Sequence, residues 1–578
     1  MSILYEICIA GEDPMLEIKT YNLSTFKLIL LPAFILVFFV SCSDTHTNVT
    51  EKEVVETPEE INARAEAVIQ GTLKEILGNS KQLPDSFKIR NASFLQYLYD
   101  QNSFQPLWSS RGSFNRKADS LLVFIDKAKE YGLFPDDYYF KRLTSLKSQL
   151  VLDTAKEKKL DASLWAYSDM MFTSAFVQIA KDLKIGRLLP DSVVAKDTTL
   201  TPEYFAFLLK SFQYNNNQMF AEQLEPKVSA YLNLKTALST FLDSADFKDY
   251  TFVNQDDSIN FRRMLIKRLS EEDSAYISAV ASPDSMQIME AIKRYQKYKG
   301  IKADGKVSNA LVTKLNDTDN DKFIRIAINM DRYKQLPPLP SQYIWVNLPS
   351  YYLQLRDSDT VVLKSRVVVG KPLTRTPIIT SAISDMITYP KWTIPESIIK
   401  KEILPGLKKD AGYTIKRGYS LVDDDGNEVD PYSVKWSKYK EGIPYKVVQG
   451  SGDDNALGVL KFNFPNKFSV YLHDTNQRYL FSKTVRALSH GCVRVQAWDE
   501  LAKFILRNDS LYSPNAVPVD SLNTWLATKQ KKYIPVRKRI PLFIRYFTCD
   551  TNKEGALVFY EDIYGEDKQM REKLFAVK

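Results

Sequence analysis

Apolar residues recur at intervals of three and four positions between about residues 80 and 275. This spacing is typical of one face of an α-helix. It is clearest in ADSLLVFIDKAKEYG and YSDMMFTSAFVQIAKDLKIG. These segments end with Gly132 and Gly186, respectively, and glycine often ends a helix. We therefore predict an all-helical domain over residues 80–275, and nothing in it suggests a catalytic site.

A shorter helical pattern follows in SMQIMEAIKRYQKYKGIKADGKVSNALVTKLN. Ile288, Ile292 and Tyr295 fall on one helical face, KGIKADG predicts a turn, and Ser308 can cap a second helix. The pattern predicts a small helical module over residues 276–320.

Strand-like alternation replaces the helical pattern from about residue 323. YIWVNLPSYYLQLRD, TVVLKSRVVVG and LKFNFPNKFSVYLHD are rich in valine and aromatic residues at alternating positions. They predict a mostly-β domain over 323–530, with a C-terminal extension, 531–578, packed on it. The partly helical stretch 391–447 interrupts the strands. Such an insertion often covers a functional site, but a peripheral decoration fits the sequence equally well.

The N-terminal part contains a nearly unbroken apolar run, Leu28–Val40, preceded by Lys27 and followed by Ser41 and Cys42. The run is too short to span a bilayer and suits the apolar region of a secretory signal. It resembles a bacterial lipoprotein signal over residues 1–42, which implies lipidation of Cys42, a lipid anchor in a membrane and a periplasm-facing place in the cell envelope. An uncleaved anchor helix is the alternative.

Acidic residues make the first fourteen positions a poor leader, and we expect translation to start at Met15. After Cys42 the sequence is polar and has no period, which predicts a flexible tether over 43–79 that includes a solvated His46.

Composition narrows the function classes. The 578 residues suffice for about four domains. The 78 basic residues nearly balance the 70 acidic ones, so no nucleic-acid partner is predicted. Of the four cysteines, Cys8 would be removed and Cys42 acylated, leaving Cys492 and Cys549. This excludes a disulfide scaffold, while a single Cys492–Cys549 disulfide and an inert, buried Cys549 both stay open.

Two of the three histidines lie close together in SVYLHDTNQRYLFSKTVRALSHGCVRV. Strand alternation places His473 with Ser469 and Tyr471, opposite the apolar side. The same period groups His490, Cys492 and Arg494. The helical stripe of Trp498, Leu501 and Ile505 then puts Cys492 near a strand-to-helix transition.

These residue types suit acyl transfer. An imidazole can activate a thiol as a nucleophile. Gly491 permits unusual backbone angles, and the N–H groups around it can stabilise an oxyanion. Arg494 offers a fixed cation to a carboxylate.

A zinc site is the competing interpretation, with His473, His490 and Cys492 as ligands and Asp474 as a fourth. No further Cys or His lies nearby and the chain has no CxxC. We therefore predict no metal and no cofactor.

The stretch HDTNQRYLFSKTVRALSHGCVR resembles the L,D-transpeptidase family, in which a histidine precedes Ser/Thr-His-Gly-Cys, an apolar residue and Arg or Asn. YIWVNLPSYYLQL, VVVGKPLTRTP, YPKWTIPESI, EILP, NALGVLKFNFPN and VYLHDT resemble its large, multidomain branch, so that the likeness covers about 323–510. The segment MEAIKRYQKYKGIKADGKVSNALVTKLN is similar to a three-helix peptidoglycan-binding module, from which Ser308 and Leu311 depart. FLQYLYDQNSFQPLW and YGLFPDDYY resemble the branch's helical scaffold domain.

The resemblance implies an α+β multidomain protein: a helical scaffold domain, a three-helix peptidoglycan-binding-like module, and a mostly-β catalytic domain with a capping subdomain at 391–447. It implies Cys492 as nucleophile, His473 as general base, and Tyr389 and Trp392 beside the substrate. The other implied site residues shape the oxyanion hole, substrate site and turn: Ser489, His490, Gly491 and Arg494.

The implied reaction is 3→3 cross-linking of peptidoglycan stem peptides, and the resemblance also implies acylation of Cys492 by carbapenems. An L,D-carboxypeptidase, a non-catalytic wall-binding lipoprotein and a generic cysteine peptidase are the alternatives. The intact His473, Cys492 and Arg494 argue against the wall-binding lipoprotein.

Overall fold

The computed structural model describes residues 54–55, 57–79, 91–156, 160–188, 201–214, 217–272 and 283–575. The expectations about Met15, Cys42, His46 and the apolar run lie outside these ranges. Within them, no helix combines the length and apolar character that a membrane crossing needs.

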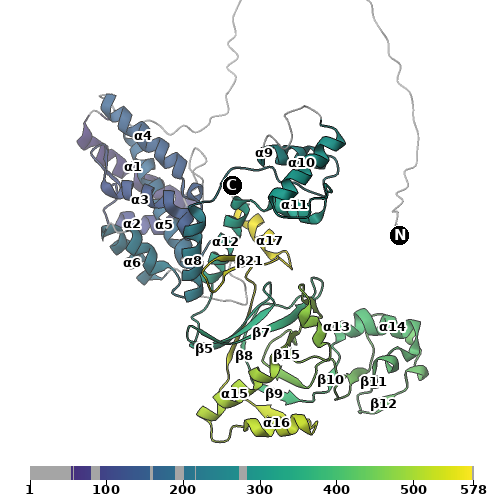
Figure 1. Cartoon of the computed structure of the whole chain (residues 1–578). Helices are drawn as coiled ribbons and strands as arrows, with labels where there is room; N and C mark the ends of the chain where they lie inside the picture. Colours follow the sequence, from purple (N-terminus) through teal and green to yellow (C-terminus); the bar gives the residue numbers. More distant parts are fainter. Residues whose placement is uncertain are drawn as a thin grey trace, which may run out of the picture. The chain divides into compact units, whose positions relative to one another are not determined.

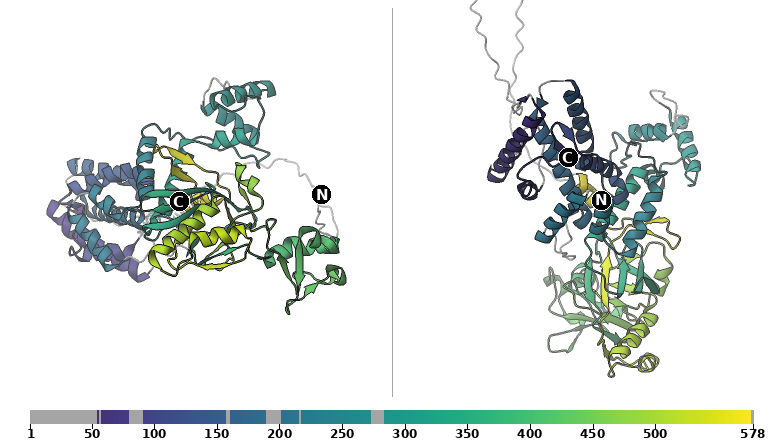
Figure 2. Two further views of the ribbon diagram at one scale, coloured as in Figure 1. Left: turned by 60° about the horizontal axis from the view of Figure 1, so that its bottom comes forward. Right: turned by 90° about the vertical axis from the view of Figure 1, so that its left-hand side faces the viewer.

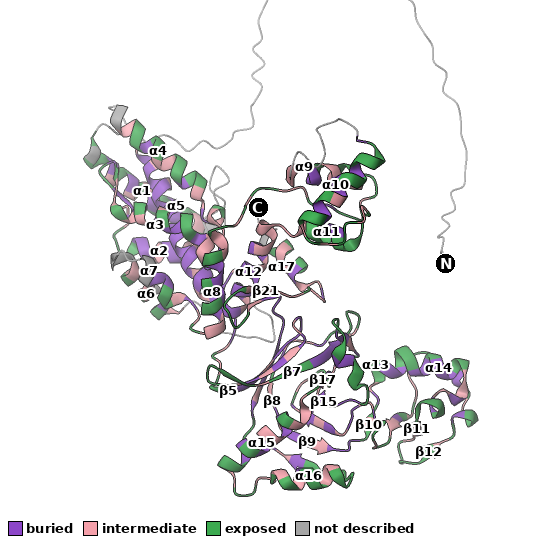
Figure 3. Ribbon diagram, viewed as in Figure 1, coloured by how far each residue is buried: buried purple, intermediate pink, exposed green. Residues whose placement is uncertain are grey.

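One long helix, α5, forms the centre of the N-terminal helical part (Figures 1 and 2). Most of its residues are buried, as Figure 3 shows, because helices contact it on several sides. The helices of this part are α1 (Pro58–Asn79), α2 (Ala92–Asp100), α3 (Arg116–Asp126), α4 (Phe140–Lys156), α5 (Ala162–Ile185), α6 (Pro202–Tyr214) and α7 (Asn217–Leu224).

Helix α1 corrects the expected tether, which was predicted to reach residue 79. Ile61, Ala65, Ile69 and Leu73 recur every four residues and are buried, and α1 contacts α5. The buried stripe is narrow and the rest of the helix surface carries charged and polar residues, so the composition suggested a solvated segment while the spacing is helical.

The small helical unit starts earlier than predicted. Helices α10 (Ser285–Tyr298) and α11 (Asn309–Asn316) share one core with α9 (Phe261–Glu272), through Leu265 and Leu269. The predicted boundary at 276 therefore cuts this unit. Ser308 caps α11 as expected, accepting a hydrogen bond from the N–H of Leu311 at 3.2 Å.

Two further helices, α8 (Ser229–Leu242) and α12 (Asp319–Lys334), pack against the hairpin β20 (Cys549–Thr551) and β21 (Leu557–Phe559). Helix α12 corrects the predicted start of the strands at 323. Thr318 caps it, and Phe323, Ile326 and Met330 form its buried stripe.

The part of the chain that the resemblance predicts to be catalytic, called the catalytic part below, is built on one curled sheet, which has eleven strands within the described range (Figure 1). Its strands are joined in the order β18-β9-β14-β15-β17-β7-β6-β5-β19-β8, and β16 pairs with β7. Their bounds are β5 (Gln342–Asn347), β6 (Tyr352–Asp357), β7 (Thr360–Gly370), β8 (Ile379–Ala382), β9 (Asp385–Thr388), β14 (Leu460–Asn463), β15 (Leu472–His473), β16 (Ala487–Ser489), β17 (Val493–Val495), β18 (Tyr533–Pro535) and β19 (Pro541–Arg545).

The C-terminal residues are part of this sheet, which corrects the expectation of a packed extension. Strand β19 lies between β5 and β8, parallel to β5 and antiparallel to β8. Two helices, α15 (Trp498–Tyr512) and α16 (Val519–Ala527), lie side by side (Figure 2), and α15 buries Leu501 and Ile505 as its stripe predicted. A last helix, α17 (Glu566–Phe575), contacts α12.

Residues 391–447 form a unit with its own small sheet and core. The sheet has the order β10-β13-β11-β12, and a helical stretch packs on it. Its elements are β10 (Trp392–Thr393), α13 (Glu396–Ile398), the π-helical turn η3 (Ile399–Ile403), α14 (Leu404–Lys409), β11 (Tyr419–Val422), β12 (Glu428–Val429) and β13 (Lys446–Gln449), the last of which runs just past residue 447. We call this unit the capping subdomain.

Candidate active site

Two neighbouring strands bring the predicted residues together. Strands β15 and β17 are parallel, with Leu472 opposite Val493 and His473 opposite Arg494. A single pocket is lined by all six predicted site residues: His473, Ser489, His490, Gly491, Cys492 and Arg494. Residues from the capping subdomain, among them Trp392, line the same pocket.

His473 is buried and neutral. Its side chain is 4% exposed, and ring Nδ1 contacts the backbone carbonyl of Asp474. Because a carbonyl oxygen only accepts, this contact places the proton of the neutral ring on Nδ1. A backbone hydrogen bond with Leu457 also acts on the ring. Burial in the first place, and the nearby Arg494 cation in the second, lower the pKa of His473 to about 3. A neutral imidazole is the form that can accept a proton from a thiol.

Cys492 is a free, partly exposed thiol at the entrance to β17. Burial raises its pKa, while hydrogen bonding to Tyr471 and the charges of Lys461 and Arg494 act in the opposite direction. Its Sγ lies 3.9 Å from the carbonyl oxygen of Ser469. The resting pocket therefore holds a neutral thiol and a neutral imidazole, and the proton has to move when the thiol attacks.

The turn that presents Cys492 is closed by Ser489. The Ser489 hydroxyl donates to the carbonyl of Cys492 at 2.6 Å and accepts from the N–H of Gly491 at 3.1 Å. Gly491 has a φ of +124°, which residues with side chains rarely adopt. The turn therefore needs both the hydroxyl of Ser489 and the missing side chain of Gly491.

Arg494 has donor capacity left over. Its Nη1 donates to the amide oxygen of Gln477 at 2.8 Å, whereas its buried Nε has no hydrogen-bond partner among the described residues. Burial lowers the pKa of Arg494, yet a guanidinium stays charged at neutral pH. An anionic ligand in the pocket would satisfy this cation.

His490 lines the pocket, but its ring reaches toward the capping subdomain. Its Nε2 lies 2.5 Å from the carboxylate of Glu402 on η3. The side chains are one-third and nearly one-half exposed, respectively. His490 thus joins the catalytic part to the capping subdomain.

Two pocket neighbours were not predicted as site residues. Tyr471 lines the pocket and contacts the His473 ring, with 5.6 Å between ring centres. The ammonium of Lys461 on β14 lies 4.0 Å from the Tyr471 ring centre, and Lys461 pairs with His473 across the strands. Both residues lie in LKFNFPNKFSVYLHD, which the sequence predicts to form strands. The alternation that assigns His473 to one face of its strand assigns Tyr471 to the same face.

Of the two aromatic residues expected near the substrate, only one lines the pocket. Trp392 does so. Tyr389 instead is buried, and its hydroxyl donates to the carbonyl of Leu526 in α16 at 3.2 Å. Tyr389 therefore packs within the catalytic domain.

The geometry gives no support to a zinc centre. Among the described residues, no three or more His, Cys, Asp or Glu side chains are arranged to hold a metal ion. The Asp474 carboxylate accepts from the N–H of Val459 at 3.1 Å and pairs with Arg478 at 3.0 Å. Cys549 is buried, and both it and Cys492 are free thiols, so they form no disulfide.

Two family models match the chain. Residues 341–519 match the L,D-transpeptidase catalytic domain, and residues 93–238 match a Scaffold domain. The chain thus carries an L,D-transpeptidase catalytic domain and a Scaffold domain, which confirms the family resemblance of the sequence.

A Haemophilus influenzae protein named "Putative L,D-transpeptidase" is 39% identical over 246 residues, which are 43% of this chain and 48% of that protein. The match thus spans about half the length of this curated relative. Two solved structures match more weakly. The NMR structure of the catalytic domain of an E. faecium L,D-transpeptidase acylated by ertapenem is 13% identical, covering 36% of this chain and 100% of that one, with a TM-score of 0.16. The Ldtfm–avibactam carbamoyl enzyme is 11% identical, covering 39% and 63%, with a TM-score of 0.14.

Proposed function

We propose that this protein is a peptidoglycan L,D-transpeptidase that forms 3→3 cross-links between stem peptides through a thioester on Cys492. The observation that carries this proposal is the single pocket in which a thiol, a neutral buried imidazole and a buried arginine donor converge. The match of residues 341–519 to the catalytic-domain model supports the reaction class.

In the first step Cys492 attacks the carbonyl carbon of the third residue of a tetrapeptide stem. The thiol proton moves to Nε2 of His473 as the sulfur–carbon bond forms. The Asp474 carbonyl holds the other ring nitrogen protonated, which keeps the imidazole in the required tautomer.

The tetrahedral intermediate carries its negative charge on the former carbonyl oxygen. Backbone N–H groups of the turn before β17, including that of Cys492, are the proposed donors to this oxyanion. When the intermediate collapses, the peptide carbon–nitrogen bond breaks and D-alanine leaves with the proton from His473. A thioester remains on Cys492.

In the second step the side-chain amine of another stem attacks the thioester. Its proton passes to His473, the carbon–sulfur bond breaks, and the thiol is regenerated. Arg494 is the proposed partner of a substrate carboxylate, such as that of a diaminopimelate side chain, because a guanidinium matches a carboxylate in charge and shape.

We further propose that the protein acts at the cell envelope as a periplasm-facing lipoprotein, held to a membrane by acylated Cys42. This proposal rests on the apolar run before Cys42 in the sequence. Mass analysis of the mature N-terminal peptide tests it, and an unmodified Cys42 would contradict it.

Mass spectrometry of disaccharide-tetrapeptide incubated with the purified protein tests the proposed reaction. We expect a dimer that is lighter than two monomers by one free alanine. Cys492→Ala, which lacks the nucleophile, is the matched control and should form none.

Formation of tripeptide monomer alone would show that water is the acceptor and that the protein is an L,D-carboxypeptidase. An unchanged substrate with the wild-type protein, under conditions in which a reference L,D-transpeptidase is active, would overturn the proposed function and favour a non-catalytic wall-binding role.

A further inference from the structure

The turn that carries the nucleophile is tied to one loop. We call residues 489–492 the nucleophile turn and residues 371–376, which follow β7, the clasp loop. The N–H of Lys371 and the hydroxyl of Thr374 both donate to the carbonyl of Ser489, at 2.9 and 3.1 Å. The hydroxyl of Thr376, which is buried, donates to the carbonyl of Gly491 at 2.8 Å.

The hydrogen bond from Thr376 to the carbonyl of Gly491 also affects the direction of the neighbouring backbone N–H group. The carbonyl of Gly491 and the N–H of Cys492 belong to the same planar peptide unit and point in opposite directions. Fixing the carbonyl therefore fixes the direction of the Cys492 N–H, the proposed oxyanion donor. Since Gly491 has no side chain and adopts a φ of +124°, its own conformational preferences restrain this plane only weakly.

The clasp loop is itself held from its other side by Tyr564. The Tyr564 hydroxyl donates to the carbonyl of Gly370 at 2.8 Å and accepts from the N–H of Thr376 at 3.2 Å. Tyr564 is only 3% exposed. One phenol hydroxyl thus connects the end of β7 to the residue that holds Gly491.

Space at the start of the clasp loop is tight. A methyl group on Gly370 would lie 2.2 Å from the carbonyl oxygen of Thr374 and 2.6 Å from the nitrogen of Thr376. The loop therefore folds directly over Gly370, and a small shift of its backbone at Thr376 is transmitted to the nucleophile turn.

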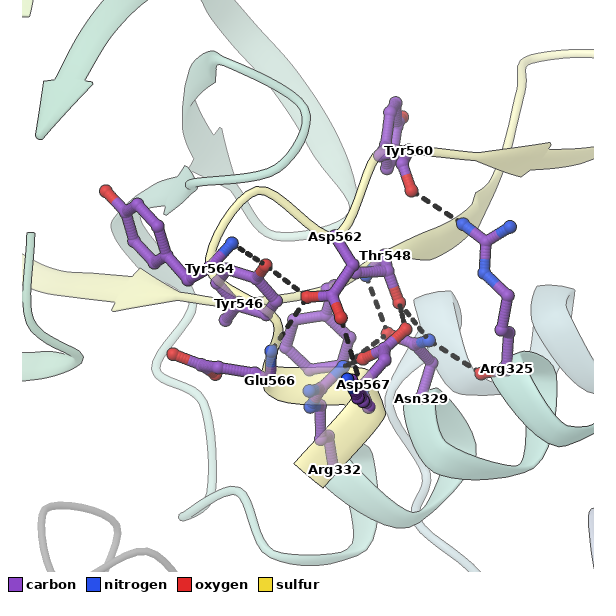
Figure 4. Close-up of polar contacts among 12 residues, drawn as sticks. Arg325, Asn329, Arg332, Tyr546, Thr548, Tyr560, Asp562, Tyr564, Glu566 and Asp567 are labelled. Atoms are coloured by element: carbon purple, nitrogen blue, oxygen red, sulfur yellow. Dashed lines mark hydrogen bonds and ion pairs between the residues drawn. The ribbon is translucent and has the colours of Figure 1, made fainter. Parts of the chain in front are cut away.

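Tyr564 is fixed by a buried network, shown in Figure 4. Its N–H donates to the hydroxyl of Tyr546 at 2.9 Å, and that hydroxyl donates to Asp562 at 2.5 Å. The two tyrosine rings stack with 5.6 Å between their centres. A few residues later Asp567 of α17 accepts from Arg332 of α12 at 2.7 Å.

We propose that Thr376 and Tyr564 are positioning residues for catalysis: they set the orientation of the Gly491–Cys492 peptide and hence of the oxyanion-hole N–H. The C-terminal segment around Tyr564 thereby acts on the chemistry although it does not contact the substrate pocket. This inference rests on the proposed function, because it assumes acyl transfer through a tetrahedral intermediate.

Two reactions of Cys492 in the full-length protein separate positioning from folding. In acylation by ertapenem the thiol adds to the β-lactam carbonyl and forms an oxyanion, whose collapse then breaks the ring carbon–nitrogen bond. Alkylation by iodoacetamide is a displacement at a saturated carbon and forms no oxyanion. The acylation rate is read from the mass of the intact protein, and alkylation from the mass of the peptide containing Cys492.

The variants are Thr376→Val, which replaces the hydroxyl by a methyl group, and Tyr564→Phe. Since loss of one oxyanion donor slows reactions about 100- to 1,000-fold, we expect misorientation of the donor to slow acylation by about 10- to 100-fold in Thr376→Val. In Tyr564→Phe, the change lies one contact further from the nucleophile turn, and we expect acylation to be slower by about 3- to 10-fold. Alkylation should stay within about two-fold of the wild type because the thiol and His473 are unchanged.

Thr376→Ser keeps the hydroxyl and should retain the acylation rate. Tyr560→Phe is the matched control in the same C-terminal segment, because the Tyr560 side chain lines a different pocket. Unchanged acylation in Thr376→Val and Tyr564→Phe, or an equal fall of acylation and alkylation, would overturn the inference. Wild-type protein that is acylated by ertapenem but forms no cross-linked dimer would count against the proposed function alone.

Discussion

His473 sets how the proposed reaction responds to acid. Its pKa is lowered to about 3, chiefly by burial. An ordinary histidine, with a pKa near 6.5, is about 97% protonated at pH 5 and would be useless there as a base. The histidine of this site should remain an acceptor at that pH.

We therefore predict that kcat/KM is nearly the same at pH 5 as at pH 7, since this parameter reports the ionisation of the free enzyme. Initial rates of cross-link formation across this range, with circular dichroism at each pH to confirm folding, measure it. A fall of kcat/KM toward acid pH with an apparent pKa near 6.5 would contradict the burial of a neutral base.

The same shift has a consequence for stability. Between about pH 3 and 6.5 the unfolded chain binds a proton at His473 that the folded protein does not bind. The contribution of His473 to the free energy of unfolding is therefore complete above about pH 6.5, and it is lost as the pH falls from about 6.5 to about 3. His473→Gln removes this contribution to the pH dependence.

At the residue scale, the alternation in the sequence predicted which side chains of a strand share a face. Alternation along two short strands is a local property, so His473, Cys492 and Arg494 could be placed in one pocket from the sequence. The partner of His490 could not be found in this way. Glu402 lies 88 residues away, and nothing local links the two.

At the element scale, the turn η3 brings the capping subdomain against the nucleophile turn. The contact is made by Glu402 and His490, both of which are partly exposed. A partly exposed polar contact of this kind contributes about 1 kcal/mol or less, so the contact biases the position of the subdomain without locking it.

Glu402→Ala should accordingly raise the KM for the stem peptide about two- to five-fold and change kcat less, because one wall of the pocket is held less firmly. Steady-state kinetics measure the two parameters. Glu441→Ala is the matched control, since Glu441 pairs with Lys400 on the surface of the same subdomain at 3.0 Å. An equal rise of KM in both variants would contradict a specific role for Glu402.

Elements were predicted best where their period was strong and local. Helix α10 and the strands around 343–370 followed from spacing alone. Helix α1 was missed because its buried stripe is narrow and lies in a polar segment. Strand β19 was missed as part of the sheet because its partners, β5 and β8, lie far away in the chain.

At the scale of the whole molecule, Asp331 of α12 connects that helix to the chain that follows α5. Its carboxylate accepts from the N–H groups of Arg187 and Leu188, each at 2.7 Å, just after α5 ends. It also faces Lys334, which is 1% exposed, at 3.4 Å. A methyl group on Gly186 would lie 2.7 Å from this carboxylate.

We predict that Asp331→Asn lowers the free energy of unfolding by about 3 kcal/mol, because it removes a buried charge that accepts from two backbone N–H groups and faces the Lys334 ammonium. Denaturant unfolding measures the change. Asp136→Asn, which removes the carboxylate of an exposed pair with Lys141, should change it by less than about 1 kcal/mol. Equal effects of the two substitutions would contradict the prediction.

The place of β19 in the sheet has a consequence for the order in which the molecule assembles. The strands that β19 joins, β5 and β8, are made roughly 160 to 200 residues earlier in synthesis. Until residues 541–545 emerge, both strands present an unpaired edge, and unpaired edges attract other chains. The catalytic sheet is therefore a late product of folding, and it is exposed to aggregation for roughly a third of the time that the chain is being made.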